Sequence, residues 1–394
     1  EDSIYSLHEK ELCDIFNDKA VKVSDQSVKD YVLFKHIVIE KKLDLQQMFS
    51  HLYPKYEDNI ILSLSSVNVI DSTKEWNEYI IAQLSEVFES VIRDQDKETF
   101  LTQFAPLLPL EAMIYINDKI EGIEYGNTTN ISQGEIEKLK NRHQISDPLL
   151  NLIGSLSITE RYDESAQLLM LFLEKCPDKL MEVYFTIVSN FGVEVELPGT
   201  YLKMQNIVNI LKSFSTKGRV FELLCVNIAE EFLRLNGSKT NTRGRKLAIT
   251  NYHLVDSIEL RDLRKSILKL LATIYPLCDS DIRQAIEKLL MNFPISEINE
   301  GFSDMIQIEL VFLENNFFDV GNITPRQENI ISLLRSGSKI YGASYVPFSG
   351  FVLSERQEFY DLLVSRKLDD MRGEDFEKYE SRRRTNIVTL FDQR

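Results

Sequence analysis

The sequence contains few of the residues that make turns, with only 15 Gly and 10 Pro among 394 residues. β-Sandwiches, β-barrels and doubly wound α/β folds need more turn residues than this, so the scarcity favours helices joined by short connections. Apolar runs of the roughly 20 residues that a membrane helix needs are also lacking, so we expect no contact with a membrane. The content of 43% hydrophobic and 27% charged residues is typical of a folded globular chain.

Basic residues are outnumbered, because 45 Lys and Arg stand against 61 Asp and Glu and leave a formal net charge of −16. Binding of DNA or RNA depends on neutralising phosphates with Lys and Arg, so this balance argues against nucleic acid as a direct partner. The chain begins at Glu1 and has no apolar segment typical of a secretion signal. We therefore expect a cytoplasmic protein, and the missing first Met indicates either processing or a piece of a longer chain.

Motifs for catalysis and for metal binding are lacking as well. The four cysteines, Cys13, Cys176, Cys225 and Cys278, are far apart and lie among apolar residues, which predicts buried, reduced thiols. Close Cys or His pairs of a zinc site, a phosphate-binding loop and the common hydrolase motifs do not occur. We therefore predict no catalytic, cofactor-binding or metal-binding residues and no cofactor. An enzyme whose site is assembled from distant helices stays an alternative.

Helical periodicity is what the sequence does contain. After residue 42, apolar residues recur at three- and four-residue spacing through the chain, which predicts one helix after another. In the first part, the predicted helices cover 44–53, 56–66, 74–93, 97–104 and 106–120. A polar, Gly-containing stretch over 122–134 is predicted to be an exposed loop, and a new helix begins after Ser146-Asp147-Pro148.

Paired helices dominate the second part of the chain. Predicted helices cover 164–175, 179–191, 202–214, 220–235, 256–275, 280–293, 296–317, 324–337, 354–368 and 373–391. The spacing of the pairs, about 34–45 residues, is similar to that of tetratricopeptide (TPR) or HEAT units. Because one pair cannot bury its apolar faces alone, we predict an all-α fold, an α-solenoid of helical hairpins that forms a TPR/HEAT-like superhelix.

The first 42 residues have a different pattern. Two short extended runs, 13–16 and 20–23, flank an Asn-Asp turn, which is a β-hairpin signal, and helical spacing follows over 26–42. Residues 7–12 have the pattern of a helix end, and helix, hairpin and helix in this order predict the end of a winged-helix-like unit. The pattern thus divides the chain into this unit (1–42), a helical linker or first solenoid part (43–159) and TPR/HEAT-like repeats (160–394).

The segment 236–253 interrupts the helices. Its first half is polar and basic and is predicted to be a loop, whereas 246–252 is predicted to be a short strand or extended edge. The candidate partner-binding residues are Arg243, Arg245, Lys246, Tyr252 and His253. Cations beside aromatic rings suit an acidic partner or a phosphate, and a solvated loop with no such role is the alternative.

Residues 7–26 (LHEKELCDIFNDKAVKVSDQ), followed by YVLFK at 31–35, resemble the end of the winged-helix domain of large bacterial STAND (signal-transduction ATPase) NTPases. This class includes the AVAST-type antiphage sensors. The run RGR at 243–245, the extended segment after it and LRDLR at 260–264 resemble part of their helical sensor region. The resemblance covers residues 7–35 well and the rest of the chain weakly.

This resemblance implies that the chain is a C-terminal sensor region, and that an effector and a P-loop NTPase lie outside it. The sensor would recognise a phage or other foreign protein and relieve autoinhibition of the NTPase, which would then form a homo-oligomer. Members of the class often carry a nucleotide-sensing His after the hairpin, but this sequence has Ser24-Asp25-Gln26 there. The alternative is a standalone helical-repeat scaffold or adaptor for protein–protein interaction.

Overall fold

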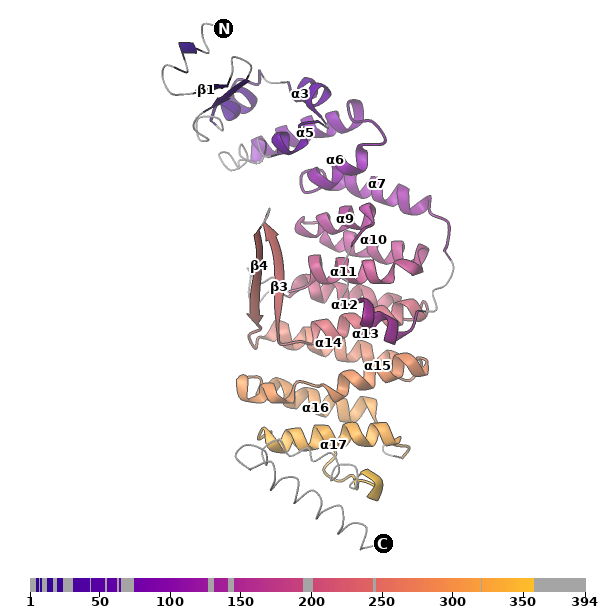
Figure 1. Ribbon diagram of the computed structural model, residues 1–394. Coiled ribbons are helices and arrows are strands. Elements are labelled where there is room, and N and C mark those ends of the chain that lie inside the picture. The colour runs from indigo at the N-terminus through magenta and orange to yellow at the C-terminus, as the bar shows by residue number, and fades with distance from the viewer. Residues whose placement is uncertain are drawn as a thin grey trace. The chain divides into compact units, whose positions relative to one another are not determined.

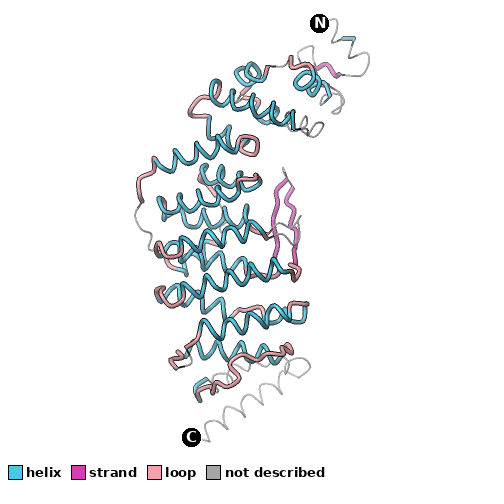
Figure 2. Tube along the Cα trace, turned by 180° about the vertical axis from the view of Figure 1, so that it is seen from behind, coloured by secondary structure: helices cyan, strands magenta, loops and turns pink. Residues whose placement is uncertain are grey.

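The structure is a computed structural model. It describes residues 5–6, 8, 13–16, 20–23, 31–42, 44–53, 55–61, 64, 74–126, 131–140, 145–193, 201–243, 246–319 and 321–357. Contacts divide the chain into two compact units: unit 1 comprises 1–124 and 145–168, and unit 2 comprises 125–144 and 169–394. Helices predominate in both units, which confirms the all-α prediction (Figures 1 and 2).

Unit 1 begins with the predicted hairpin. Strand β1 (Cys13–Phe16) pairs antiparallel with β2 (Ala20–Val23), with Cys13 opposite Val23. A π-helical turn (Lys35–Ile39) follows. The helices of this unit are α3 (Leu45–Leu52), α5 (Lys74–Ser90), α6 (Lys97–Phe104), α7 (Pro109–Glu121) and α9 (Pro148–Ser155).

An aromatic cluster forms the core between the first helices of unit 1. The rings of Phe100 and Phe104 lie 4.7 Å apart between centroids, and Phe49 meets Phe100 edge-on at 5.6 Å. Phe49 and Phe100 are fully buried. Edge-on and tilted contacts of this kind add to the stabilisation that burial of the rings already gives. This core explains why the short helices α3 and α6 are stable.

Unit 2 is a two-row stack of helices. Helix α10 (Tyr162–Lys175) runs from unit 1 into unit 2. It is followed by α11 (Leu180–Phe191), α12 (Leu202–Phe214), α13 (Arg219–Phe232), α14 (Ile258–Ile274), α15 (Ser280–Met291), α16 (Ser303–Phe317) and α17 (Pro325–Ile340). From α11 to α15, each helix contacts the next but one, so α12, α14 and α16 form one row and α11, α13, α15 and α17 form the other (Figure 1). This arrangement is that of a helical repeat, as predicted.

A buried ion pair joins two helices of one row, and its arginine also reaches the other row. The guanidinium of Arg264 on α14 is fully buried and donates from Nε and Nη2 to the carboxylate of Glu309 on α16, at 2.7 and 2.8 Å. Its Nη1 donates to the carbonyl oxygen of Leu233, just after α13. Bidentate pairing satisfies both charges where water has no access. The end of α13 is therefore fixed where the chain leaves the stack.

Three predicted boundaries are wrong. The segment 236–243 is not a loop but strand β3 (Asn236–Arg243), which pairs antiparallel with β4 (Lys246–His253). The predicted helix 296–317 is split into a 3₁₀ helix, η4 (Ile295–Glu300), and α16, because Gly301 adopts a left-handed φ of 97°. The predicted loop 122–134 ends early, since helix α8 (Gln133–Leu139) begins inside it. The strand predicted at 246–252 is confirmed.

Two further predictions fall at the end of the chain. Of the helices predicted at 354–368 and 373–391, only 354–357 lies among the described residues, and 355–357 is helical. None of the described helices combines the length and the hydrophobicity needed to cross a lipid bilayer. The division of the chain at 42 and 159 stays a prediction.

Candidate protein-binding surface

The predicted partner-binding residues belong to the β3–β4 hairpin, which extends beside the helices of unit 2 (Figure 2). Arg243 and Lys246 are cross-strand partners at the end of the ladder, and Arg245 lies outside the described residues. Tyr252 and His253 occupy the other end of β4, about 20 Å from Lys246 at the usual rise per strand residue. The structure thus brings Arg243 and Lys246 together and separates them from Tyr252 and His253.

The register also sorts these residues by face. Lys239 and Arg243 are four positions apart on β3, and Lys246 is the partner of Arg243, so the three cationic positions share one face of the hairpin. Tyr252 is at a position of that same face, and His253 is at a position of the opposite one. The sequence contains no Asp or Glu from 236 to 255. In an acidic chain, this hairpin is a local concentration of positive charge.

Tyr252 and His253 fix the base of the hairpin. The ring of His253 packs against that of Phe302 at 5.7 Å between centroids. Tyr252 is half-buried and lies over Gly237, where an added Cβ would come within 2.6 Å of the phenol oxygen. Burial, together with the charge of Glu231, raises the pKa of Tyr252. These contacts give both side chains a role in positioning the hairpin.

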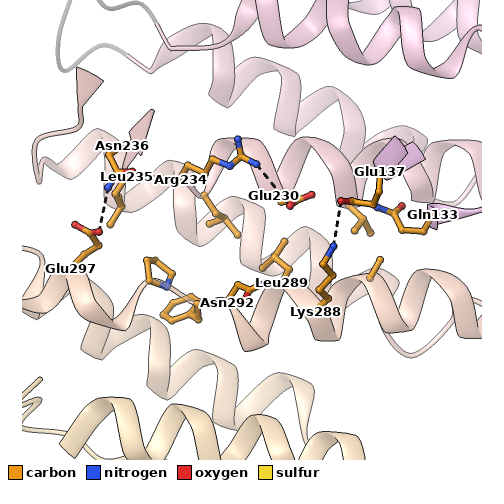
Figure 3. A pocket seen from close by; sticks show the side chains of 15 residues that line it. Gln133, Glu137, Glu230, Arg234, Leu235, Asn236, Lys288, Leu289, Asn292 and Glu297 are labelled. Atoms are coloured by element: carbon orange, nitrogen blue, oxygen red, sulfur yellow. Dashed lines mark hydrogen bonds and ion pairs between the residues drawn. The ribbon is translucent and has the colours of Figure 1, made fainter. Parts of the chain in front are cut away.

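A cavity of about 330 Å³ opens at this base, between α13, α15 and α8 (Figure 3). Its charged lining consists of Glu137, Glu230, Arg234, Lys288 and Glu297. Lys288 pairs with Glu137 at 3.3 Å, Arg234 approaches Glu230 at 3.9 Å, and the Asn236 amide donates to Glu297 at 3.3 Å. A lining that contains carboxylates, cations and amides can form hydrogen bonds and ion pairs, so it suits a polar peptide segment better than an apolar small molecule.

Helix α8, which supplies Gln133 and Glu137 to this cavity, was missed by the sequence analysis. A signal for it existed, because Ser132 and Glu135 form a capping box. The Ser132 Oγ accepts from the Glu135 amide at 3.3 Å, and the Glu135 carboxylate accepts from the Ser132 amide at 2.8 Å. The hydrogen bonds that the backbone amide and the hydroxyl of Ser132 donate to the Glu135 carboxylate lower the pKa of Glu135. A Ser-x-x-Glu search within 122–134 and the residues after it would have found the helix.

Cysteine and metal chemistry add little to this surface. None of the four cysteines forms a disulfide; Cys13, Cys225 and Cys278 are buried as predicted, and Cys176 is half-buried. Burial raises the pKa of the Cys225 thiol, which keeps this thiol protonated and unreactive. In the part of the chain that the structure describes, no three His, Cys, Asp or Glu side chains are grouped so that they could hold a metal ion.

The surface therefore consists of a cationic hairpin and a polar cavity at its base, both in unit 2. Such a surface can bind through charge and backbone hydrogen bonds, and its described residues include no nucleophile activated by a neighbouring base. No model of a known protein family matches the chain, and no curated protein or solved structure is significantly similar to it.

Proposed function

We propose that this chain is the C-terminal sensor module of a bacterial STAND-type NTPase and that it recognises a phage or other foreign protein. The observation that supports this proposal is the two-row helical repeat of unit 2, interrupted by one cationic hairpin. Helical-repeat stacks present extended surfaces that suit protein partners. Positive charge on the hairpin attracts an acidic surface, and the net charge of −16 repels nucleic acid.

In this proposal the chain performs no chemistry of its own. The sequence contains no P-loop motif, so ATP hydrolysis, the effector and homo-oligomer formation belong to other parts of a longer cytoplasmic parent. Binding of the trigger protein must favour one conformation of that parent over another, because a ligand shifts an equilibrium only by its difference in affinity between two states.

The test is a double charge reversal, Arg243→Glu with Arg245→Glu. The tagged chain is co-expressed with individual phage open reading frames, and stoichiometric complexes are identified by native mass spectrometry. We expect one protein to bind tightly, and we expect the reversal to weaken binding at least about tenfold while the melting temperature stays the same.

The matched control reverses Lys265 and Lys269, two exposed cations on α14, to Glu. An equal loss of binding in this control would mean that overall charge, not the hairpin, drives association. Unchanged binding by the Arg243→Glu/Arg245→Glu variant would remove the hairpin from the interface. Stoichiometric binding of many unrelated proteins would contradict a sensor.

The helical repeat by itself supports a second candidate function, a standalone scaffold or adaptor. The two candidates differ in the size of the native protein. Blotting extracts of the source cell with an antibody against this chain separates them: a band far above 45.7 kDa supports the sensor, and a band at 45.7 kDa supports the scaffold.

A further inference from the structure

The cavity at the base of the hairpin is built by unit 2 alone. Helices α13, α15 and α8 line it, together with the first residue of β3 and with η4 (Figure 3). Its volume of about 330 Å³ is at the small end of the range for ligand sites, roughly 300–1,000 Å³. It therefore has room for one long side chain of a partner, but not for a folded element.

One carboxylate of the cavity lining has no cation to balance it. The five charged residues of the lining are three carboxylates and two cations. Glu137 pairs with Lys288 at 3.3 Å, and Glu230 pairs with Lys140. Among the described residues, none forms an ion pair with the third carboxylate, Glu297. The cavity thus has one negative charge more than it has positive charges.

The two cations of the lining are held by their own partners. Lys288 is paired with Glu137, as described above. Arg234 donates from Nη1 to Glu231 at 2.8 Å, and its guanidinium turns toward Glu230 and away from Glu297 (Figure 3). Since both cations are neutralised locally, they do little to repel a positive group that approaches Glu297.

The carboxylate of Glu297 lacks donors. Its Oε1 accepts one hydrogen bond, from the side-chain amide of Asn236, and the distance of 3.3 Å is long for such a bond. Its Oε2 is buried, and no described group donates to it. A carboxylate oxygen that has lost water without gaining a donor is unfavourable, so a ligand that brings donors is favoured here. The residue as a whole is half-buried, so a small rotation of the terminal carboxylate presents both oxygens to the cavity.

Apolar side chains line the cavity beside this carboxylate. Leu235 and Phe293 are buried residues of the lining, and Leu289 lies between the end with Glu297 and the end with Lys288 (Figure 3). Apolar walls suit the methylene groups of a long basic side chain, whose charged end then reaches the carboxylate. An aromatic ring also favours a planar guanidinium over an ammonium group.

We propose that this cavity binds an arginine side chain of the protein partner, whose guanidinium donates to both carboxylate oxygens of Glu297. Arginine fits better than lysine because its planar fork pairs with the two oxygens at once. This inference rests on the proposed protein-binding function and adds a contact of opposite sign to the cationic hairpin. Arg243 and Asn236 are at opposite ends of β3, roughly 20 Å apart at the usual rise per strand residue. The partner would therefore carry an arginine about that far from an acidic patch.

The test uses two small probes, N-acetyl-arginine methylamide and its neutral isostere N-acetyl-citrulline methylamide. Each is titrated into the full chain with ¹³C-labelled leucine methyl groups, and the methyl shifts of Leu233, Leu235 and Leu289 report on the cavity. We expect the arginine probe to shift these methyls saturably. The citrulline probe should bind at least about tenfold more weakly, because it has the same shape without the charge.

Glu297→Gln is the variant that tests the assigned carboxylate. It keeps the size of the side chain and removes its charge, so arginine and citrulline should bind this variant equally weakly. The matched control is Glu89→Gln, the same change at an exposed position of α5 in unit 1, which should keep the preference for arginine. Thermal unfolding followed by circular dichroism shows that both variants are folded.

Three outcomes would overturn the inference. They are unchanged leucine methyls on addition of the arginine probe, equal binding of arginine and citrulline, and a preference for arginine that survives in Glu297→Gln. Loss of the preference in Glu89→Gln as well would assign it to overall charge and would also overturn the inference.

These results are separable from the test of the proposed function. If the cavity ignores arginine while a phage protein still binds through the hairpin, the inference fails and the proposed function stands. If the cavity selects arginine but no phage protein binds, the site stands and the proposed sensor fails.

Discussion

Two cation–carboxylate pairs of unit 2 lie in opposite surroundings. Arg264 and Glu309, between α14 and α16, are 0% and 6% exposed, whereas Lys288 and Glu137, between α15 and α8, are 54% and 33% exposed. Water solvates either member of the exposed pair when the other leaves, but neither member of the buried pair can be left alone. The comparison shows that burial, and not the presence of a charge pair by itself, decides how much stability is lost when one partner is removed.

The largest effect is expected from Arg264→Met. This change leaves the carboxylate of Glu309 buried without a cation and removes a donor from the carbonyl oxygen of Leu233. Loss of one partner of a buried pair costs about 3–5 kcal/mol of the free energy of unfolding. Urea unfolding followed by circular dichroism measures it.

The double variant Arg264→Met/Glu309→Leu is the control for this prediction. Because it removes both charges and fills their space with apolar groups, it should recover most of the lost stability. If the single change costs less than about 1 kcal/mol, the pair behaves like an exposed one and the contrast with Lys288–Glu137 fails.

The helical rows could be predicted from the sequence because their signal is local. The spacing of apolar residues predicts α6 and α12 with the boundaries that the structure has, 97–104 and 202–214. The regions that were missed depend on partners far away. The polar residues of β3 carry no alternating pattern, and their strand conformation comes from pairing with β4.

The candidate surface was predicted only in part for the same reason. The sequence identified the cationic positions Arg243 and Lys246, but the length of the strands, which separates them from Tyr252 and His253, has no local signal. Helix α8 is seven residues long, too short for its periodicity to stand out. Its stabilisation comes from a docking site built by residues about 90 and more positions away.

An intermediate effect is expected from Asn227→Ala, which removes a buried amide that serves α8. The two hydrogen bonds with Gln133 are lost, at about 1 kcal/mol each, and the Gln133 amide turns to water. Exchange in α8 should therefore accelerate by about 10- to 30-fold, as hydrogen exchange can measure, with less effect on α13. Asn209→Ala, at an exposed position of α12, is the matched control. Equal acceleration in α8 and α13 would make Asn227 a residue of the stack interior only.

The smallest effect is expected at the exposed pair and should depend on pH. Burial raises the pKa of Glu137, but the hydrogen bonds and charges of Lys140 and Lys288 outweigh it, so that the pKa is lowered from 4.5. A carboxylate whose pKa is lower in the folded state adds stability above its unfolded pKa, and this stability is lost as the pH falls through the folded pKa. Glu137→Gln should therefore be less stable than the wild type at neutral pH and equally stable in acid.

Urea unfolding of the wild type and of Glu137→Gln measures the difference between their free energies of unfolding. This difference should be present at about pH 7 and absent at about pH 3. The difference at neutral pH should stay below about 1 kcal/mol and shrink in about 0.5 M salt, because water and ions screen an exposed pair. Glu124→Gln, which removes the same charge from an exposed position of unit 1, is the matched control. A difference that persists in salt would place Glu137 with the buried pair Arg264–Glu309, because only a charge shielded from solvent resists screening. A difference that grows in acid would contradict the lowered pKa of Glu137.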